Sequence, residues 1–202
     1  MSTTSRGTLF EDRVFSALQN ELKSNRLGIS PKSAQIFRKK SYYSKDRESS
    51  IVTDISIEMV LPKKTKPTLI WIFECKDYAG TIPVNDIEEF DSKLQQIGAH
   101  NTKGTIVTSC ALQSGAFSVS KSKGIGVIRL LPDDQVMHIL ELMASTSFVR
   151  KVNWSEFPKA LLTPGHRSKE YFFGAQDGRW FADWTSLISH ELSKVLKPRT
   201  KD

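Results

Sequence analysis

TLIWIFECK, residues 68–76, is the stretch of this 202-residue sequence that decides the fold. Its almost continuous apolar run predicts a strand buried on both faces, as at the centre of a sheet that helices cover. The run ends on Glu74 and Lys76, which share one strand face because they lie two positions apart. Charged side chains on such a strand cost free energy unless they are paired or bind a metal. The stretch therefore predicts a covered central strand whose polar end needs a partner or a ligand.

The segment before it, residues 51–60, predicts a neighbouring strand because apolar and polar residues alternate along it. If the two strands pair as a hairpin around Lys64, Asp54 falls close to residues 74–76. Whether Asp54 faces them depends on the register, since a slip of one residue reverses every side chain. In the favourable register, two carboxylates and one ammonium meet at the end of a buried strand. Glu58 is the rival acid on the same face, but it lies further from that strand end.

The hydrophobic pattern elsewhere indicates alternating helices and strands. We expect helices over residues 7–22, 84–97 and 114–123, and strands over residues 33–38, 104–110 and 125–131. This order predicts an α/β fold in which helices flank a mixed central β-sheet.

The sequence changes in character from Pro132 onward. There we expect a helix over 133–143, an irregular segment over 145–167, a hairpin of strands 170–175 and 179–182, and a helix over 187–196. We therefore divide the chain into a core, residues 1–131, and a small α+β C-terminal extension (helix, hairpin, helix), residues 132–202, packed on that core.

Asp54, Glu74 and Lys76 together indicate metal-dependent chemistry at a phosphate. Two carboxylates supply the oxygen ligands that Mg²⁺ prefers and leave positions for water and substrate. A bound ion lowers the pKa of its water and neutralises the charge that builds on phosphate oxygens. A lysine beside it orients the nucleophile or stabilises the transition state. The alternative for Glu74 and Lys76 is a plain surface ion pair.

Composition narrows the class of partner and excludes some sites. Lysine and arginine number 29 against 22 acidic residues, a net charge of +7, which favours a polyanion such as nucleic acid. Cys75 and Cys110 form no CxxC pair and the histidines are scattered, so zinc-site spacing is absent. The first residues, MSTTSRGTLFEDR, lack an apolar signal core, and no apolar run is long enough for a membrane span. We expect a soluble, intracellular (cytoplasmic) protein without a membrane partner.

Several short motifs follow one another in order between residues 7 and 131. They are Gly7-x-x-Phe10-Glu11, Thr53-Asp54-Ile55, Phe73-Glu74-Cys75-Lys76-Asp77-Tyr78, VNDIEEFDSKLQQIGA (84–99), Val107-Thr108-Ser109, and Gly115-Ala116 before Gly124-Ile125. This ordered set resembles the PD-(D/E)xK nuclease superfamily, and within it the Mrr-like (type IV-like) branch of restriction endonucleases. The resemblance implies a restriction-endonuclease-like core over residues 1–131.

The resemblance also implies a reaction and a role for each matched residue. The reaction is endonucleolytic hydrolysis of DNA phosphodiester bonds with Mg²⁺ or Mn²⁺, in restriction, host defence or DNA processing. Asp54 and Glu74 match the metal-binding carboxylates, with the backbone carbonyl of Cys75 as a further implied ligand. Lys76 matches the catalytic lysine. Glu11 matches an acid of the first helix that reaches the active site; its alternative is a first-turn glutamate that suits the helix dipole.

The resemblance extends to partners. A homodimer is expected if both DNA strands are cut. The winged-helix reader of many Mrr-like enzymes is not apparent, so target choice falls to residues 132–202 or to a separate specificity partner. Three basic clusters are candidate contacts for DNA phosphates, which position a duplex without reading its sequence. Their residues are Arg38, Lys39 and Lys40, then Lys63 and Lys64, then Lys121 and Lys123. The alternative for each cluster is an ordinary solvated surface.

Two other functions stay open. One is a non-catalytic DNA-binding or assembly module that kept the nuclease fold, although a dead copy need not retain Asp54, Glu74 and Lys76. The other is an enzyme of the same fold that acts on branched DNA, as Holliday-junction-type resolvases do.

Overall fold

A computed structural model describes residues 3–24, 33–98, 100–132 and 152–196. The strands are β1 (Ala34–Arg38), β2 (Ser41–Ser44), β3 (Ser49–Val52), β4 (Ile55–Met59), β5 (Leu69–Lys76), β6 (Thr102–Thr108), β7 (Gly126–Leu130), β8 (Phe172–Gln176) and β9 (Arg179–Phe181). The helices are α1 (Thr3–Lys23), α2 (Val84–Gly98), α3 (Ser114–Ser122), α4 (Phe157–Leu162) and α5 (Trp184–Leu196), with a 3-10 turn η3 (Trp154–Glu156). Within the described ranges, no helix combines the length and apolarity that crossing a bilayer requires.

Seven strands form one mixed sheet in the order β1-β4-β5-β6-β7-β8-β9. β5 pairs antiparallel with β4 and parallel with β6, and β6 pairs parallel with β7. The outer pairs, β1–β4, β7–β8 and β8–β9, are antiparallel. The predicted α/β fold with a mixed central sheet is therefore confirmed.

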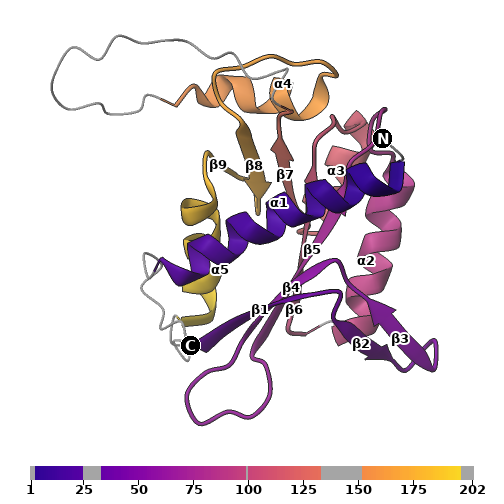
Figure 1. Cartoon of the computed structure of the whole chain (residues 1–202), viewed down its shortest axis with the longest axis vertical. Coiled ribbons are helices and arrows are strands. Elements are labelled where there is room, and N and C mark those ends of the chain that lie inside the picture. The colour runs from indigo at the N-terminus through magenta and orange to yellow at the C-terminus, as the bar shows by residue number, and fades with distance from the viewer. Residues whose placement is uncertain (1–2, 25–32, 99, 133–151, 197–202) are drawn as a thin grey trace, which may run out of the picture.

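Helices cover both faces of this sheet, and β5 shows how its residues are divided between them. Trp71 and Phe73 pack in the core on the face that α1 and α5 cover, where α1 crosses the strands in Figure 1. Ile70 and Ile72 pack in the other core, against α2, α3 and α4. Side chains alternate along a strand, so Glu74 lies on the α2 side of the sheet. This is the layer from which one of its ion-pair partners, Lys93 of α2, comes.

The prediction of one continuous strand over residues 51–60 is wrong. Backbone hydrogen bonds from Lys39 N–H to Asp54 O (2.9 Å) and from Thr53 N–H to Lys40 O (3.0 Å) carry the β1–β4 ladder into a bend. Beyond the bend, β2 and β3 form a separate two-stranded sheet, which projects from the main sheet in Figure 1. Ile51 and Thr53 are buried, like Ile55 after the bend, so every second residue is buried on both sides of the bend. The hydrophobic period of the sequence therefore does not reveal the bend.

The chain after Pro132 contributes strands to the same sheet. β8 pairs with β7, and β8 turns into β9 through Asp177 and Gly178, both of which have positive φ, at 49° and 73°. Two positive φ values in a two-residue loop match the hairpin turn expected there. Part of the segment expected to be irregular is helical instead, as η3 and α4, which are too short to show a helical period. The helix expected over 133–143 lies outside the described residues, and the boundary at 131/132 stays a prediction.

Candidate active site

Asp54, Glu74 and Lys76 meet at the end of β5. The β4–β5 register pairs Ile55 with Phe73, so Asp54, one position beyond, lies beside Glu74. The Oδ2 atom of Asp54 accepts a hydrogen bond of 2.9 Å from the backbone N–H of Cys75. The structure thus has the favourable register, in which Asp54 contacts the Glu74-Cys75-Lys76 edge.

Glu11 joins Asp54 through a shared ammonium. Lys39 Nζ lies 2.6 Å from Glu11 Oε2 and 2.7 Å from Asp54 Oδ1, while Arg38 Nη2 lies 3.4 Å from Glu11 Oε1. Glu11 is buried and stands in the interior of α1, which begins at Thr3. The alternative of a first-turn glutamate that suits the helix dipole is therefore wrong, because the helix begins earlier than its apolar stripe.

Glu74 has two lysine partners of its own. Its Oε1 lies 3.3 Å from Lys76 Nζ and 3.1 Å from the Nζ of Lys93, on α2. Lys93 also pairs with Glu89, one helical turn earlier, at 3.2 Å. Sequence reasoning missed Lys93, which lies next to the buried Leu94 at the margin of the apolar stripe of α2. A helical period locates that margin, but only the tertiary structure shows that it meets Glu74.

The acids of the site keep its lysines charged. Burial by itself lowers the pKa of Lys76, but the charge of Glu74 offsets it, and the net pKa lies above the ordinary value. The pKa values of Lys93 and Lys39 are raised in the same way, by Glu74 and Glu89 and by Asp54 and Glu11. A lysine with a raised pKa is protonated at neutral pH. Lys76 can therefore act as a cation and hydrogen-bond donor rather than as a base.

The carboxylates of the site also suppress ionisation of the thiol of Cys75, which lies between Glu74 and Lys76 in the sequence. Burial is the largest cause that raises the pKa of Cys75 well above its ordinary value, and the carboxylates of Asp54, Glu11 and Glu74 add to it. Cys75 is therefore a neutral thiol at physiological pH. Coordination by its backbone carbonyl stays a prediction.

The donor set fits a hard divalent cation. Glu11 and Asp54 approach one positive centre, the ammonium of Lys39, within 2.7 Å. That ammonium stands where a cation bound by both carboxylates would lie. Mg²⁺ and Mn²⁺ prefer oxygen ligands such as carboxylates, whereas softer metals prefer sulfur and nitrogen ligands. Glu74 precedes Cys75, whose backbone N–H donates to Asp54. The carboxylate of Glu74 forms ion pairs with Lys76 and Lys93.

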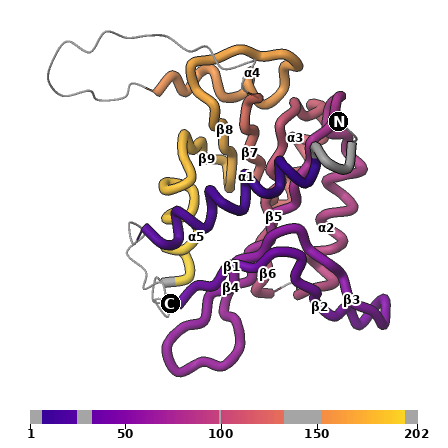
Figure 2. The backbone as a smooth tube through the Cα atoms, viewed as in Figure 1, coloured from indigo at the N-terminus to yellow at the C-terminus, as the bar shows by residue number. Residues whose placement is uncertain are grey.

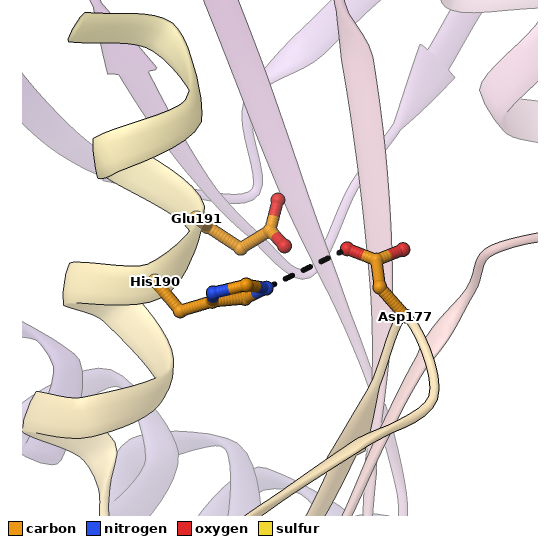
Figure 3. A group of neighbouring side chains, drawn as sticks. All are labelled: Asp177, His190 and Glu191. Carbon is orange, nitrogen blue, oxygen red and sulfur yellow. Dashed lines mark ion pairs between the residues drawn. The ribbon is translucent and has the colours of Figure 1, made fainter. Parts of the chain in front are cut away.

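A second, more compact cluster lies elsewhere. Of all His, Cys, Asp and Glu side chains in the described ranges, Asp177, His190 and Glu191 form the one trio whose ligand atoms lie within 4.8 Å of one another. Asp177 belongs to the β8–β9 turn and the other two to α5, as Figure 3 shows. The Nε2 of His190 lies 4.0 Å from Asp177 Oδ2, and Lys194 pairs with both Asp177 and Glu191. One ammonium thus already serves both carboxylates.

The predicted DNA-contacting residues divide between the two ends of the sheet. Arg38 is the last residue of β1, and Lys39 and Lys40 follow it. Arg38 and Lys39 pair with acids of the candidate site, whereas Lys40 pairs with Glu58 at 2.6 Å. Glu58 also accepts a hydrogen bond from the Tyr42 hydroxyl, so both of its partners lie outside the candidate site.

The remaining four lysines lie at the opposite end. Lys63 and Lys64 are in the loop 60–68 that precedes β5, the long loop in Figure 2. Lys121 and Lys123 come at the end of α3, just before β7 starts, and Lys123 pairs with Asp91 at 2.9 Å. Because β5 and β7 run in the same direction, their starts lie at the end of the sheet away from the candidate site. A strand rises about 3.3 Å per residue, so the length of β5 separates the groups by roughly 20 Å.

Comparison with known proteins supplies the family. The Mrr_cat family, described as restriction endonuclease, matches residues 33–140, more than half of the chain. No match was found among curated proteins. The chain is similar to the crystal structure of a protein of unknown function, AF1548, at 12% identity and a TM-score of 0.38, over 55% of this chain and 56% of that one. The chain thus spans little more than half the length of that protein. The Mrr_cat match contains Asp54, Glu74 and Lys76, and this chain belongs to the Mrr_cat restriction endonuclease family.

Proposed function

We propose that the protein is a divalent-metal-dependent endonuclease that hydrolyses DNA phosphodiester bonds. Its family is one of nucleases of restriction-endonuclease type, whose substrate is DNA and whose members usually use divalent metals. The observation that carries the proposal is the hydrogen bond from Cys75 N–H to Asp54 Oδ2. It sets Asp54 against Glu74 and Lys76, so that two carboxylates and an ammonium share one strand end.

Each side chain has a distinct task in this proposal. Asp54 and Glu74, with Glu11 beside them, hold the ion, Mg²⁺ or Mn²⁺. When bound, the ion supplies Lewis-acid activation of water and neutralises phosphate charge. Lys76 donates to the phosphate oxygens as negative charge develops, which its raised pKa permits. Lys93 touches neither water nor phosphate in this scheme; it is a positioning residue that orients Glu74.

Cleavage of supercoiled plasmid tests the proposal directly. We expect nicked or linear product with Mg²⁺ or Mn²⁺ and none with EDTA. Lys76→Ala should abolish the product while its circular dichroism spectrum and melting temperature match those of the wild type. A folded Lys76→Ala protein that cuts as fast as the wild type would overturn the role of Lys76. Asp54→Asn should lose divalent-ion binding in a calorimetric titration, and an unchanged titration would remove Asp54 from the site.

A non-catalytic DNA-binding or assembly module is the second candidate, and one observation favours it. Each acid of the site already has a cationic partner: Lys39 for Glu11 and Asp54, and Lys76 and Lys93 for Glu74. A cluster neutralised in this way can hold the fold together without an ion. Plasmid that is retarded in a gel but never cut, with any divalent ion, would support this function. Faster cutting of a four-way junction than of linear duplex would instead support a Holliday-junction-type resolvase.

Three finer statements rest on the resemblance alone. They are the homodimer, the separate specificity partner and a role in restriction, host defence or DNA processing. Sedimentation of the protein with a DNA duplex would measure the first of them, since a homodimer would bring one active site to each strand.

A further inference from the structure

We infer that Lys39 is an exchangeable counter-ion of the candidate metal site: its ammonium neutralises Glu11 and Asp54 before an ion binds and leaves when one does. The inference rests on the proposed function, because it concerns the same carboxylates. It adds a residue-specific link between ion binding and DNA binding.

The contacts of Lys39 use the oxygen atoms that an ion would need. Asp54 Oδ2 is engaged by the backbone N–H of Cys75, which leaves Oδ1, and Lys39 Nζ lies 2.7 Å from Oδ1. Glu11 Oε1 faces Arg38 at 3.4 Å, while Oε2 lies 2.6 Å from the same Nζ of Lys39. A divalent ion that joined Asp54 and Glu11 would therefore bind the two oxygens that Lys39 occupies.

Both cations cannot keep these contacts at once. Mg²⁺ binds carboxylate oxygens at about 2.1 Å, so an ammonium left on the same oxygens would stand within a few ångströms of it. Two like charges at that separation repel strongly in a partly buried site. The ion and the ammonium of Lys39 therefore compete, and binding of one favours departure of the other.

Exposure identifies Lys39 as the partner that leaves. Its side chain is 53% exposed, whereas those of Glu11 and Asp54 are 9% and 24% exposed. The lysines on Glu74 are enclosed by comparison, with Lys76 at 16% and Lys93 at 21%. The carboxylates are therefore the more enclosed partners, and of these three lysine side chains only that of Lys39 is more than half exposed.

The backbone keeps Lys39 at the rim of the site after its ammonium has moved. Lys39 has a φ of 46°, a left-handed value that residues with a side chain rarely adopt. Its N–H donates to Asp54 O at 2.9 Å, so its Cα stays fixed beside that residue. A released ammonium anchored there can bind a phosphate of the DNA. The ion pairs seen here and the predicted DNA contact are thus two states of one side chain.

A Mn²⁺ titration without DNA, followed by electron paramagnetic resonance, tests the competition. Lys39→Met keeps most of the aliphatic length and removes the charge, and we expect it to bind Mn²⁺ at least about tenfold more tightly than the wild type, as loss of one close ion pair predicts. Lys40→Met is the matched control, because Lys40 lies at the same bend but pairs with Glu58. Its Mn²⁺ affinity should stay within about threefold, the effect of a more distant charge.

A variant that restores the positive charge at position 39 separates the effect of charge from other effects of Lys39→Met on Mn²⁺ affinity. Lys39→Arg should return the affinity towards the wild-type value, and Lys39→Gln should behave like Lys39→Met if either neutral variant folds poorly. Equal affinities for Lys39→Met, Lys40→Met and the wild type would overturn the inference, as would weaker binding by Lys39→Met alone.

The DNA arm of the same experiment uses the Lys76→Ala background to prevent cutting. Without Lys39→Met, Mg²⁺ should strengthen duplex binding, because it frees an ammonium for a phosphate; with Lys39→Met added, that Mg²⁺-dependent gain should shrink severalfold. An unchanged gain would overturn the release of Lys39 towards DNA.

The outcomes separate the inference from the proposed function. A wild-type protein that binds Mn²⁺ and cuts DNA, with Lys39→Met unchanged in Mn²⁺ affinity, overturns the inference alone. If neither protein binds Mn²⁺, both fail together. Binding by Lys39→Met with none by the wild type would show that the ammonium blocks the ion rather than exchanging with it, and would contradict metal-dependent cleavage by the wild type.

Discussion

The two ends of the sheet both collect carboxylates and lysines, yet they are built differently. At the bend before β4 and the end of β5, Glu11, Asp54 and Glu74 come from three different segments and are paired with Lys39, Lys76 and Lys93. At the β8–β9 turn, Asp177 and Glu191 share Lys194. The more compact cluster is the one that lies outside the matched residues 33–140. The acids Asp54 and Glu74 of the candidate site lie within the matched residues.

Protonation behaviour differs in the same way. Burial raises the pKa of Glu191, whereas Lys194 lowers the pKa of Asp177 although burial opposes it. One acid of that cluster is thus drawn towards its neutral form, which suits a structural network. In the candidate site, the pKa values of all three lysines are raised, so full positive charge faces the carboxylates. The proposed exchange of Lys39 for an ion concerns one of these charges.

The largest contrast between the ends should appear in catalysis. Glu74→Gln is expected to slow plasmid cleavage by about a thousandfold, because it removes a charge that we propose holds the ion. Glu191→Gln, the matched change at the other end, should cut at a rate close to the wild type. Initial rates at saturating Mg²⁺ measure both. Similar losses in the two variants would contradict an active site at the end of β5.

For the free energy of unfolding, we expect a clear effect of substitution at the β8–β9 turn. Lys194→Met leaves Asp177 and Glu191 without their shared ammonium, and we expect it to lower the free energy of unfolding by about 1–3 kcal/mol, a buried-pair value reduced because Lys194 is partly exposed. The loss should shrink as the pH falls through the range where Asp177 becomes protonated, since its depressed pKa contributes stability only above that range. Urea denaturation at neutral and acidic pH measures this, and a loss independent of pH would contradict it.

Lys93 gives a smaller test within the candidate site. Lys93→Ala removes one of two cations on Glu74, so we expect kcat to fall about tenfold while KM for DNA stays unchanged, as a positioning role predicts. Lys93→Arg should recover most of the rate. A rise in KM with unchanged kcat would instead indicate that Lys93 binds DNA.

The smallest effect concerns the thiol of Cys75. Its pKa is raised first by burial and then by Asp54, so Asp54→Asn should increase the thiolate fraction only severalfold at a given pH. The rate of iodoacetamide labelling at pH 8, in a Cys110→Ser background, measures that fraction. A decrease in the labelling rate would show that Asp54 does not act on the thiol through its charge.

The sequence by itself determined the central strand, the candidate triad and the family. Burial of residues 69–74 and the positions of Asp54, Glu74 and Lys76 in the sequence follow from the local hydrophobic period and from motif order. These features depend on residues close together in the chain, and side-chain alternation is a local property of a strand. The same pattern failed at Thr53 and Asp54, where the strand bends, because a bend that preserves alternation leaves no trace in the period.

Only the tertiary structure decided which charges meet. The choice of Lys39 as partner of Glu11 and Asp54, the arrival of Lys93 at Glu74, and the division of the basic residues between two ends of the sheet all depend on register and helix rotation. Ion pairs join residues far apart in the chain, and their energies fall steeply with distance and exposure. A list of charged residues cannot contain that information, because it belongs to the distances between them.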